Sequence, residues 1–117
     1  MDGVFVPNIT FGAPVIKALR SRTSLFFDVH LMITDPARHI AAFRDAGADM
    51  LVIHAETDPH PQRTLTEIRR LGCKAGLAFN PGTDISCLRW FAADIDMALI
   101  MSVHPGWGGQ RFLPETL

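Results

Sequence analysis

One ten-residue segment carries the strongest chemical signal in the sequence. Residues 101–110 read Met-Ser-Val-His-Pro-Gly-Trp-Gly-Gly-Gln, so an apolar run ends in a turn that holds Gly106, Gly108 and Gly109. Glycine has no Cβ and adopts positive φ freely, which lets successive backbone N–H groups converge on an anion. The segment therefore predicts a phosphate-binding loop. A tight surface turn, with glycines for steric reasons alone, is the alternative.

Imidazole and amide side chains end the apolar runs that precede this loop, namely His30, His54 and Asn80. Neutral imidazole is a common metal ligand, although a lone histidine in a strand is more often a hydrogen-bonded core residue. Strand alternation places Asp28 on the same face as His30, where a carboxylate is able to orient the imidazole. For His54 and Glu56 we favour a polar wall or a structural hydrogen bond over a metal pair.

The elements that must position these residues repeat along the chain. Apolar runs begin near Leu25, Met50, Lys74 and Met97, at intervals of about two dozen residues. Strands alternating with helices at this spacing predict βαβ units and a parallel sheet covered on both faces. From start and stop residues, helices are expected over about 13–20, from Asp35-Pro36 to Gly47, from Pro61 to Gly72, and onward from Thr83-Asp84.

Two architectures use this unit, the doubly wound open sheet and the (β/α)₈ barrel. A polar residue at each strand end is typical of the active face of a barrel. An open sheet would have a G-x-G-x-x-G turn after its first strand, and the sequence has none there. We therefore predict an α/β fold, a partial (β/α)₈ TIM barrel. Its residues 1–117 form a single incomplete domain with four full strands and the end of another at 1–4.

Composition narrows the class of protein. The chain has 117 residues, a net charge of −1, 48% hydrophobic residues and no basic run. These values favour one small domain with no nucleic-acid or membrane partner, and a cytoplasmic location is expected. Cys73 and Cys87 lack CxxC spacing, which favours reduced structural thiols over a disulfide or a metal site.

Four motifs, taken together and in order, resemble the ribulose-phosphate 3-epimerase family. They occupy residues 1–12, 28–32, 80–83 and 101–110 and so span the chain. The resemblance implies a (β/α)₈ barrel that interconverts D-ribulose 5-phosphate and D-xylulose 5-phosphate in the pentose phosphate pathway. The proton moves on and off C3 with the help of a divalent metal ion, for which zinc, iron, manganese and cobalt are the candidates.

The resemblance also assigns site residues. It makes His30 a metal ligand beside the substrate, with Asp28 as a residue that lines the site. The segment Gly106, Trp107, Gly108 and Gly109 becomes the grip on the substrate phosphate. Methionines on three strands, Met1, Met32 and Met101, are expected to line the active centre and shield it from water.

The two aspartates that move the proton in this family fall outside the motifs found here, so no catalytic residue is assigned. We expect a member truncated at both ends, inactive alone, with open strand edges near 1–4 and 97–101 that favour self-association. Two alternatives remain: a non-catalytic phosphosugar-binding or half-barrel remnant, and a related hexulose-phosphate 3-epimerase. The expected partner is a small phosphosugar, and the full-length family is expected to form homo-oligomers.

Overall fold

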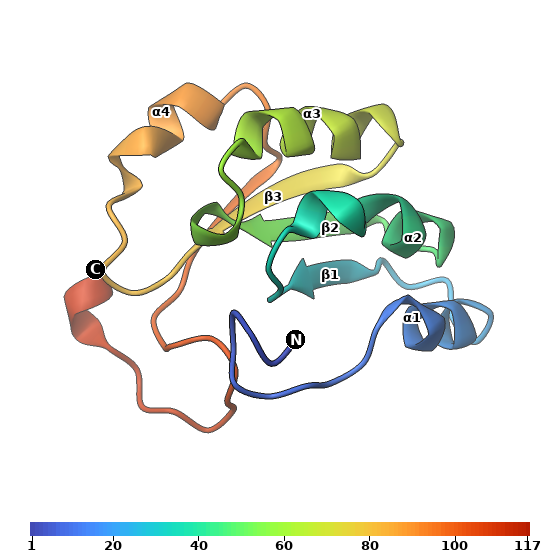
Figure 1. Cartoon of the computed structure of the whole chain (residues 1–117), viewed down its shortest axis with the longest axis horizontal. Coiled ribbons are helices and arrows are strands. Elements are labelled where there is room, and N and C mark those ends of the chain that lie inside the picture. Colours follow the sequence, from blue (N-terminus) through green and yellow to red (C-terminus); the bar gives the residue numbers. More distant parts are fainter.

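The computed structural model describes residues 1–117 and contains one four-stranded sheet. The strands follow the order β1-β2-β3-β4, and each neighbouring pair is parallel. Figure 1 shows β1, β2 and β3 side by side. A helical segment joins each strand to the next, so the predicted α/β repeat of a partial barrel is confirmed. The strands are β1 (Asp28–Leu31), β2 (Met50–His54), β3 (Lys74–Phe79) and β4 (Met97–Ile100).

Four α-helices accompany the sheet, and the first of them precedes β1 (Figure 1). Glycines in the left-handed region end two of them: Gly47 follows α2 with φ of 107°, and Gly72 follows α3 with φ of 85°. The helices are α1 (Ala13–Arg20), α2 (Ile40–Asp45), α3 (Pro61–Arg70) and α4 (Leu88–Phe91).

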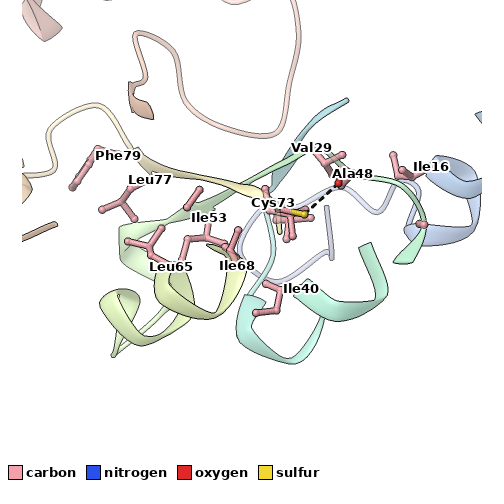
Figure 2. Close-up of a cluster of buried hydrophobic side chains, with 14 residues drawn as sticks. Ile16, Val29, Ile40, Ala48, Ile53, Leu65, Ile68, Cys73, Leu77 and Phe79 are labelled. Atoms are coloured by element: carbon pink, nitrogen blue, oxygen red, sulfur yellow. Dashed lines mark hydrogen bonds between the residues drawn. The ribbon is translucent and has the colours of Figure 1, made fainter. Parts of the chain in front are cut away.

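The main core lies between the sheet and the helices, because alternate strand residues point to that side. Figure 2 shows this cluster between the strands and α2 and α3. On the opposite face, Met50, Val52 and Ala78 form a smaller buried cluster. The main cluster has 14 buried members: Ile16, Val29, Leu31, Ile40, Ala46, Ala48, Leu51, Ile53, Leu65, Ile68, Cys73, Ala75, Leu77 and Phe79.

The two cysteines are free and differ in their surroundings. Cys73 is buried, and its Sγ donates a hydrogen bond to the carbonyl oxygen of Ala48 at 3.2 Å (Figure 2). Burial raises the pKa of this thiol. Cys87, at the end of the short 3₁₀ turn before α4, is half-buried.

The helix predicted from Asp35-Pro36 to Gly47 is divided into two pieces. A 3₁₀ turn covers Pro36–Arg38, and α2 begins only at Ile40. Asp35 occupies the N-cap position before Pro36, but it has φ of 50° and its side chain caps no backbone N–H group. The carboxylate instead lies 3.8 Å from the Arg38 guanidinium, and an N-cap that bonds the first turn normally has an extended backbone rather than a left-handed one.

The strand predicted at residues 1–4 is also absent. Only an isolated antiparallel bridge joins Asp2 to Ile9. The reason is local: Gly3 turns the chain with φ of 74°, and the Asp2 carboxylate accepts the backbone N–H groups of Val4 and Phe5. An Asx turn of this kind competes with an extended strand.

The open edges of the sheet are therefore β1 and β4, whereas one edge was expected at residues 1–4. The run that begins near Leu25 becomes a strand only at Asp28, and Leu25 itself is exposed. Arg20 accounts for the delay, since its guanidinium donates to the carbonyl oxygens of Thr23 and Leu25 and holds them outside the ladder. None of the helices has the length and apolar character needed to cross a membrane.

Candidate functional site

The N-terminal segment, residues 1–11, connects the carboxyl ends of the strands. The Asp2 carboxylate accepts the backbone N–H and the hydroxyl of Thr34, which follows β1, at 2.7 and 2.9 Å. The ring of Phe5 lies 4.7 Å from that of His54, at the end of β2. The Asn8 amide donates to the carbonyl oxygen of Gly106, beyond β4. One short segment thus contacts residues at or beyond the carboxyl ends of three strands.

Two histidines meet at this end of the sheet. The Nε2 atoms of His30 and His54 lie 2.8 Å apart, and their rings are nearly parallel, with an interplanar angle of 19°. His54 is fully buried, whereas His30 is half-buried and reaches a cavity. The cavity has a volume of about 480 Å³, and Met1 and Met32 also line it.

Both imidazoles are neutral at physiological pH. Burial, together with the proximity of His54 and of the N-terminal amino group, lowers the pKa of His30 to about 4. Burial also lowers the pKa of His54, and the contact with Glu56 offsets only part of this effect. Each ring therefore has one N–H group and one nitrogen lone pair.

Glu56 connects this histidine pair to the end of β3. One oxygen lies 3.1 Å from His54 Nδ1, and the other accepts the Asn80 backbone N–H at 2.7 Å and the Thr83 hydroxyl at 2.6 Å. Partial burial acts to raise the pKa of Glu56, but these hydrogen bonds outweigh it and hold the pKa below its usual value. The structural hydrogen bond that we favoured for His54 and Glu56 is thus present.

The Gln110 side chain holds the glycine loop together by hydrogen bonds to its backbone. Gln110 accepts the His104 N–H at 3.2 Å and donates to the carbonyl oxygens of His104 and Trp107 at 2.6 and 2.8 Å. The backbone N–H groups of residues 106–109 make no hydrogen bond within the chain. Trp107 is 61% exposed. Four adjacent amides thus remain available to an anion.

The remaining predicted site residues lie elsewhere. Met101 is buried, and its backbone N–H bonds to Phe79, but it does not line the cavity that Met1 and Met32 line. Asp28 is exposed and makes no hydrogen bond to His30; partial burial raises its pKa. The alternation that we predicted for β1 places Asp28 on the His30 face, yet the histidine takes its partner from β2.

The residues present do not by themselves fit a divalent metal. No three of the histidine, cysteine and acidic side chains gather closely enough to hold an ion. The nitrogen of His30 that faces its neighbour is already bonded to His54. His30 is therefore a single candidate ligand rather than part of a site that this chain completes.

Sequence reasoning missed two contacts here, the histidine pair and the anchoring of residues 1–11. The first needs the register of β1 against β2, which single-strand patterns do not give. A signal for the second was available, since Asp2 followed by Gly3 is typical of an Asx turn.

The anchoring by Asp2 leads to a stability prediction. Partial desolvation acts to raise the pKa of Asp2, but hydrogen bonds from Thr34, Val4 and Phe5 outweigh it and hold the pKa well below its usual value. Asp2→Asn is expected to lower the free energy of unfolding at neutral pH by about 1 kcal/mol, a figure kept small because the carboxylate is not fully buried. The loss should shrink as the pH falls below about 4, where the unfolded chain protonates first.

Urea denaturation at neutral and acidic pH measures both effects. Asp35→Asn is the control, because Asp35 has only a 3.8 Å surface contact with Arg38 and asparagine tolerates its positive φ. A pH-independent loss in Asp2→Asn would contradict the role of the ionised carboxylate.

Comparison with known proteins identifies the family of the chain. The profile of the ribulose-phosphate 3 epimerase family matches residues 1–117. The chain is 49% identical over 117 residues to the ribulose-phosphate 3-epimerase of Bacillus subtilis, with all of this chain and 54% of the relative covered. It is also 49% identical over 119 residues to the enzyme of that name from Synechocystis, covering 100% of this chain and 52% of the relative.

A chloroplastic ribulose-5-phosphate-3-epimerase of Arabidopsis thaliana is likewise 49% identical over 119 residues, with 100% of this chain and 42% of the relative covered. The chain thus spans about half the length of the curated relatives it matches. With its parallel sheet, its histidine pair and its glycine loop, the chain belongs to the ribulose-phosphate 3-epimerase family.

Proposed function

We propose that this chain forms the substrate-holding part of an epimerase that interconverts D-ribulose 5-phosphate and D-xylulose 5-phosphate. The observation that carries the proposal is the N-terminal segment, which contacts both His54 of the histidine pair and Gly106 of the glycine loop. A phosphosugar requires such an arrangement, with an anion-binding site for the phosphate at one end and polar groups beside the reacting carbon at the other. The names of the relatives supply the substrate class.

In this proposal the loop at residues 106–109 holds the phosphate. Its unbonded N–H groups provide neutral donors, and glycine leaves the backbone open to approach. No Cβ built at Gly108 or Gly109 would meet another atom within 4 Å, so the space beside these two residues is free. Gly106 serves differently, since it packs against Val6 and Asn8 and fixes the start of the loop.

His30 is proposed to face the reacting end of the sugar. Removal of a proton next to a ketone creates an enediolate, and a divalent cation stabilises that charge. His30 would supply one neutral imidazole ligand, and no two further histidine, cysteine or acidic side chains gather with it to complete a site. Zinc, iron, manganese and cobalt all accept imidazole. A cytoplasmic location and a homo-oligomeric state remain part of the proposal for the whole protein.

Phosphosugar binding without catalysis is the second candidate. One observation favours it. Glu56 is the acidic side chain that is hydrogen-bonded to the histidine pair, and its other oxygen is already occupied by Asn80 and Thr83. A hexulose-phosphate 3-epimerase would use the same loop and the same histidine. This enzyme would differ from the first candidate in the length of its sugar substrate, a hexulose instead of a pentulose.

A binding experiment with an exchange assay tests these candidates. We expect ribulose 5-phosphate to shift the amide resonances of residues 106–109 in a ¹H–¹⁵N spectrum, and unphosphorylated ribulose to leave them unchanged. Exchange of the C3 proton with deuterated solvent is expected to stay at the metal-free blank, because proton transfer needs an acid and a base on opposite faces.

Exchange above the blank would make the chain an active epimerase in its own right. A stronger response to a hexulose phosphate than to ribulose 5-phosphate would favour the related enzyme. Loop resonances unmoved by either phosphosugar would overturn the proposal.

A further inference from the structure

We propose that Glu56, acting through His54, decides which nitrogen of His30 carries the proton. In this arrangement His30 is protonated at Nε2 and presents the lone pair of Nδ1. The inference rests on the proposed function only for the identity of the ligand that binds His30. The tautomer itself follows from four hydrogen bonds in the chain.

The first step concerns Glu56. A carboxylate accepts hydrogen bonds and donates none. One oxygen of Glu56 accepts from the Asn80 backbone and the Thr83 hydroxyl, so the side chain is held at the end of β3. The other oxygen lies 3.1 Å from His54 Nδ1, which must therefore be the N–H nitrogen of that ring.

The second step concerns His54. A neutral imidazole has a single N–H group, so a proton on Nδ1 leaves a lone pair on Nε2. This lone pair faces His30 Nε2 at 2.8 Å. Two lone pairs at that distance would repel, so His30 must donate from Nε2. The rings are nearly parallel, with an interplanar angle of 19° and centroids 4.8 Å apart, and the two Nε2 atoms are their point of hydrogen-bond contact.

The third step concerns the remaining ring nitrogen of His30, Nδ1. His30 Nδ1 has no hydrogen-bond partner in the chain and is not a buried unpaired atom. Any ligand that binds His30 therefore meets Nδ1 first. A ligand that requires Nε2 must break the bond to His54, whose ring is fully buried beneath Phe5 and unable to find water in exchange. Glu56 and His54 are thus positioning residues for His30.

Replacing the carboxylate by an amide should reverse the arrangement. In Glu56→Gln the carbonyl oxygen must face Asn80, because the backbone N–H there is a donor only. The amide NH₂ then faces His54 Nδ1, which has to become an acceptor. His54 would carry its proton on Nε2 and donate to His30, and His30 would move its proton to Nδ1.

The experiment is ¹⁵N NMR of the histidine rings at neutral pH, with long-range couplings that separate protonated from unprotonated nitrogens. In the unchanged chain we expect His30 protonated at Nε2 and His54 at Nδ1. In Glu56→Gln we expect both assignments reversed. Glu67→Gln is the matched control, because Glu67 bonds Arg70 on the surface of α3 and touches neither ring.

A merely structural role of Glu56 would lower stability without exchanging the two protons. The unchanged chain decides the matter even if the variant does not fold. His30 protonated at Nδ1, or all histidines in the mixture typical of free imidazole, would overturn the proposal. Since no sugar or metal is added, this result is independent of whether phosphosugar binding succeeds.

Discussion

Truncation of Phe79 to alanine is expected to lower the free energy of unfolding by about 3 to 5 kcal/mol. Phe79 is the largest fully buried side chain and the last residue of β3. It packs in the main core, and its carbonyl oxygen accepts the N–H of Met101, so a cavity here loosens the exit of β4 as well. Urea denaturation followed by circular dichroism measures the loss.

Phe112→Ala is the matched control for this truncation. Phe112 is 51% exposed and belongs to neither buried cluster, so its truncation should cost less than about 1 kcal/mol. Equal losses in the two variants would mean that the core between the sheet and the helices does not carry the stability of the chain.

Gly106→Ala is expected to cost about 1 to 3 kcal/mol of unfolding free energy and to weaken phosphosugar binding. Gly106 has φ of 117°, which side chains rarely adopt. A Cβ there would lie 3.1 Å from Asn8 Oδ1 and 3.3 Å from Val6 Cβ. The substitution would therefore separate the loop from the N-terminal segment. Denaturation and titration with ribulose 5-phosphate measure the two effects.

Gly108→Ala provides the control for stability. Gly108 does not have a positive φ, and a Cβ there would meet no atom within 4 Å. Its unfolding free energy should stay within about 0.5 kcal/mol of the unchanged chain. A loss as large as that of Gly106→Ala would show that the loop responds to any side chain, not to the backbone strain at Gly106.

Periodicity predicted most of the elements because each is a short amphipathic or apolar run with a clear stop. The strands Met50–His54 and Lys74–Phe79 and the helix Ala13–Arg20 lie where the sequence placed them. Glycine at 47 and 72 ended the helices for the reason expected, a left-handed residue after the last turn.

The errors arose where one side chain redirects the backbone. Asp2 and Arg20 take up backbone groups at residues 1–5 and 23–25, and apolar runs there do not become strands. A hydrophobic pattern does not predict hydrogen bonds between a side chain and the nearby backbone.

The site was predicted only in part, for a geometric reason. The sequence identified His30 and the glycine loop separately, but the contact between His30 and His54 depends on strand register. In the structure His30 pairs with Val52, which places His54 two residues further along the same face. A shift by one residue would turn the two imidazoles to opposite faces.

The contrast between the two cysteines has a practical consequence for all of these measurements. Cys73 is buried and hydrogen-bonded, and the pKa of its thiol is raised, so little of the thiolate that attacks alkylating reagents is present. Cys87 packs at the margin of the main core but is only half-buried, so we expect it to react first. The folded chain therefore offers one thiol to a mass-tagged maleimide and the unfolded chain offers two. Counting tags per molecule by mass spectrometry after a short, fixed labelling time compares the exposure of Cys73 among the variants, without denaturant or an optical probe.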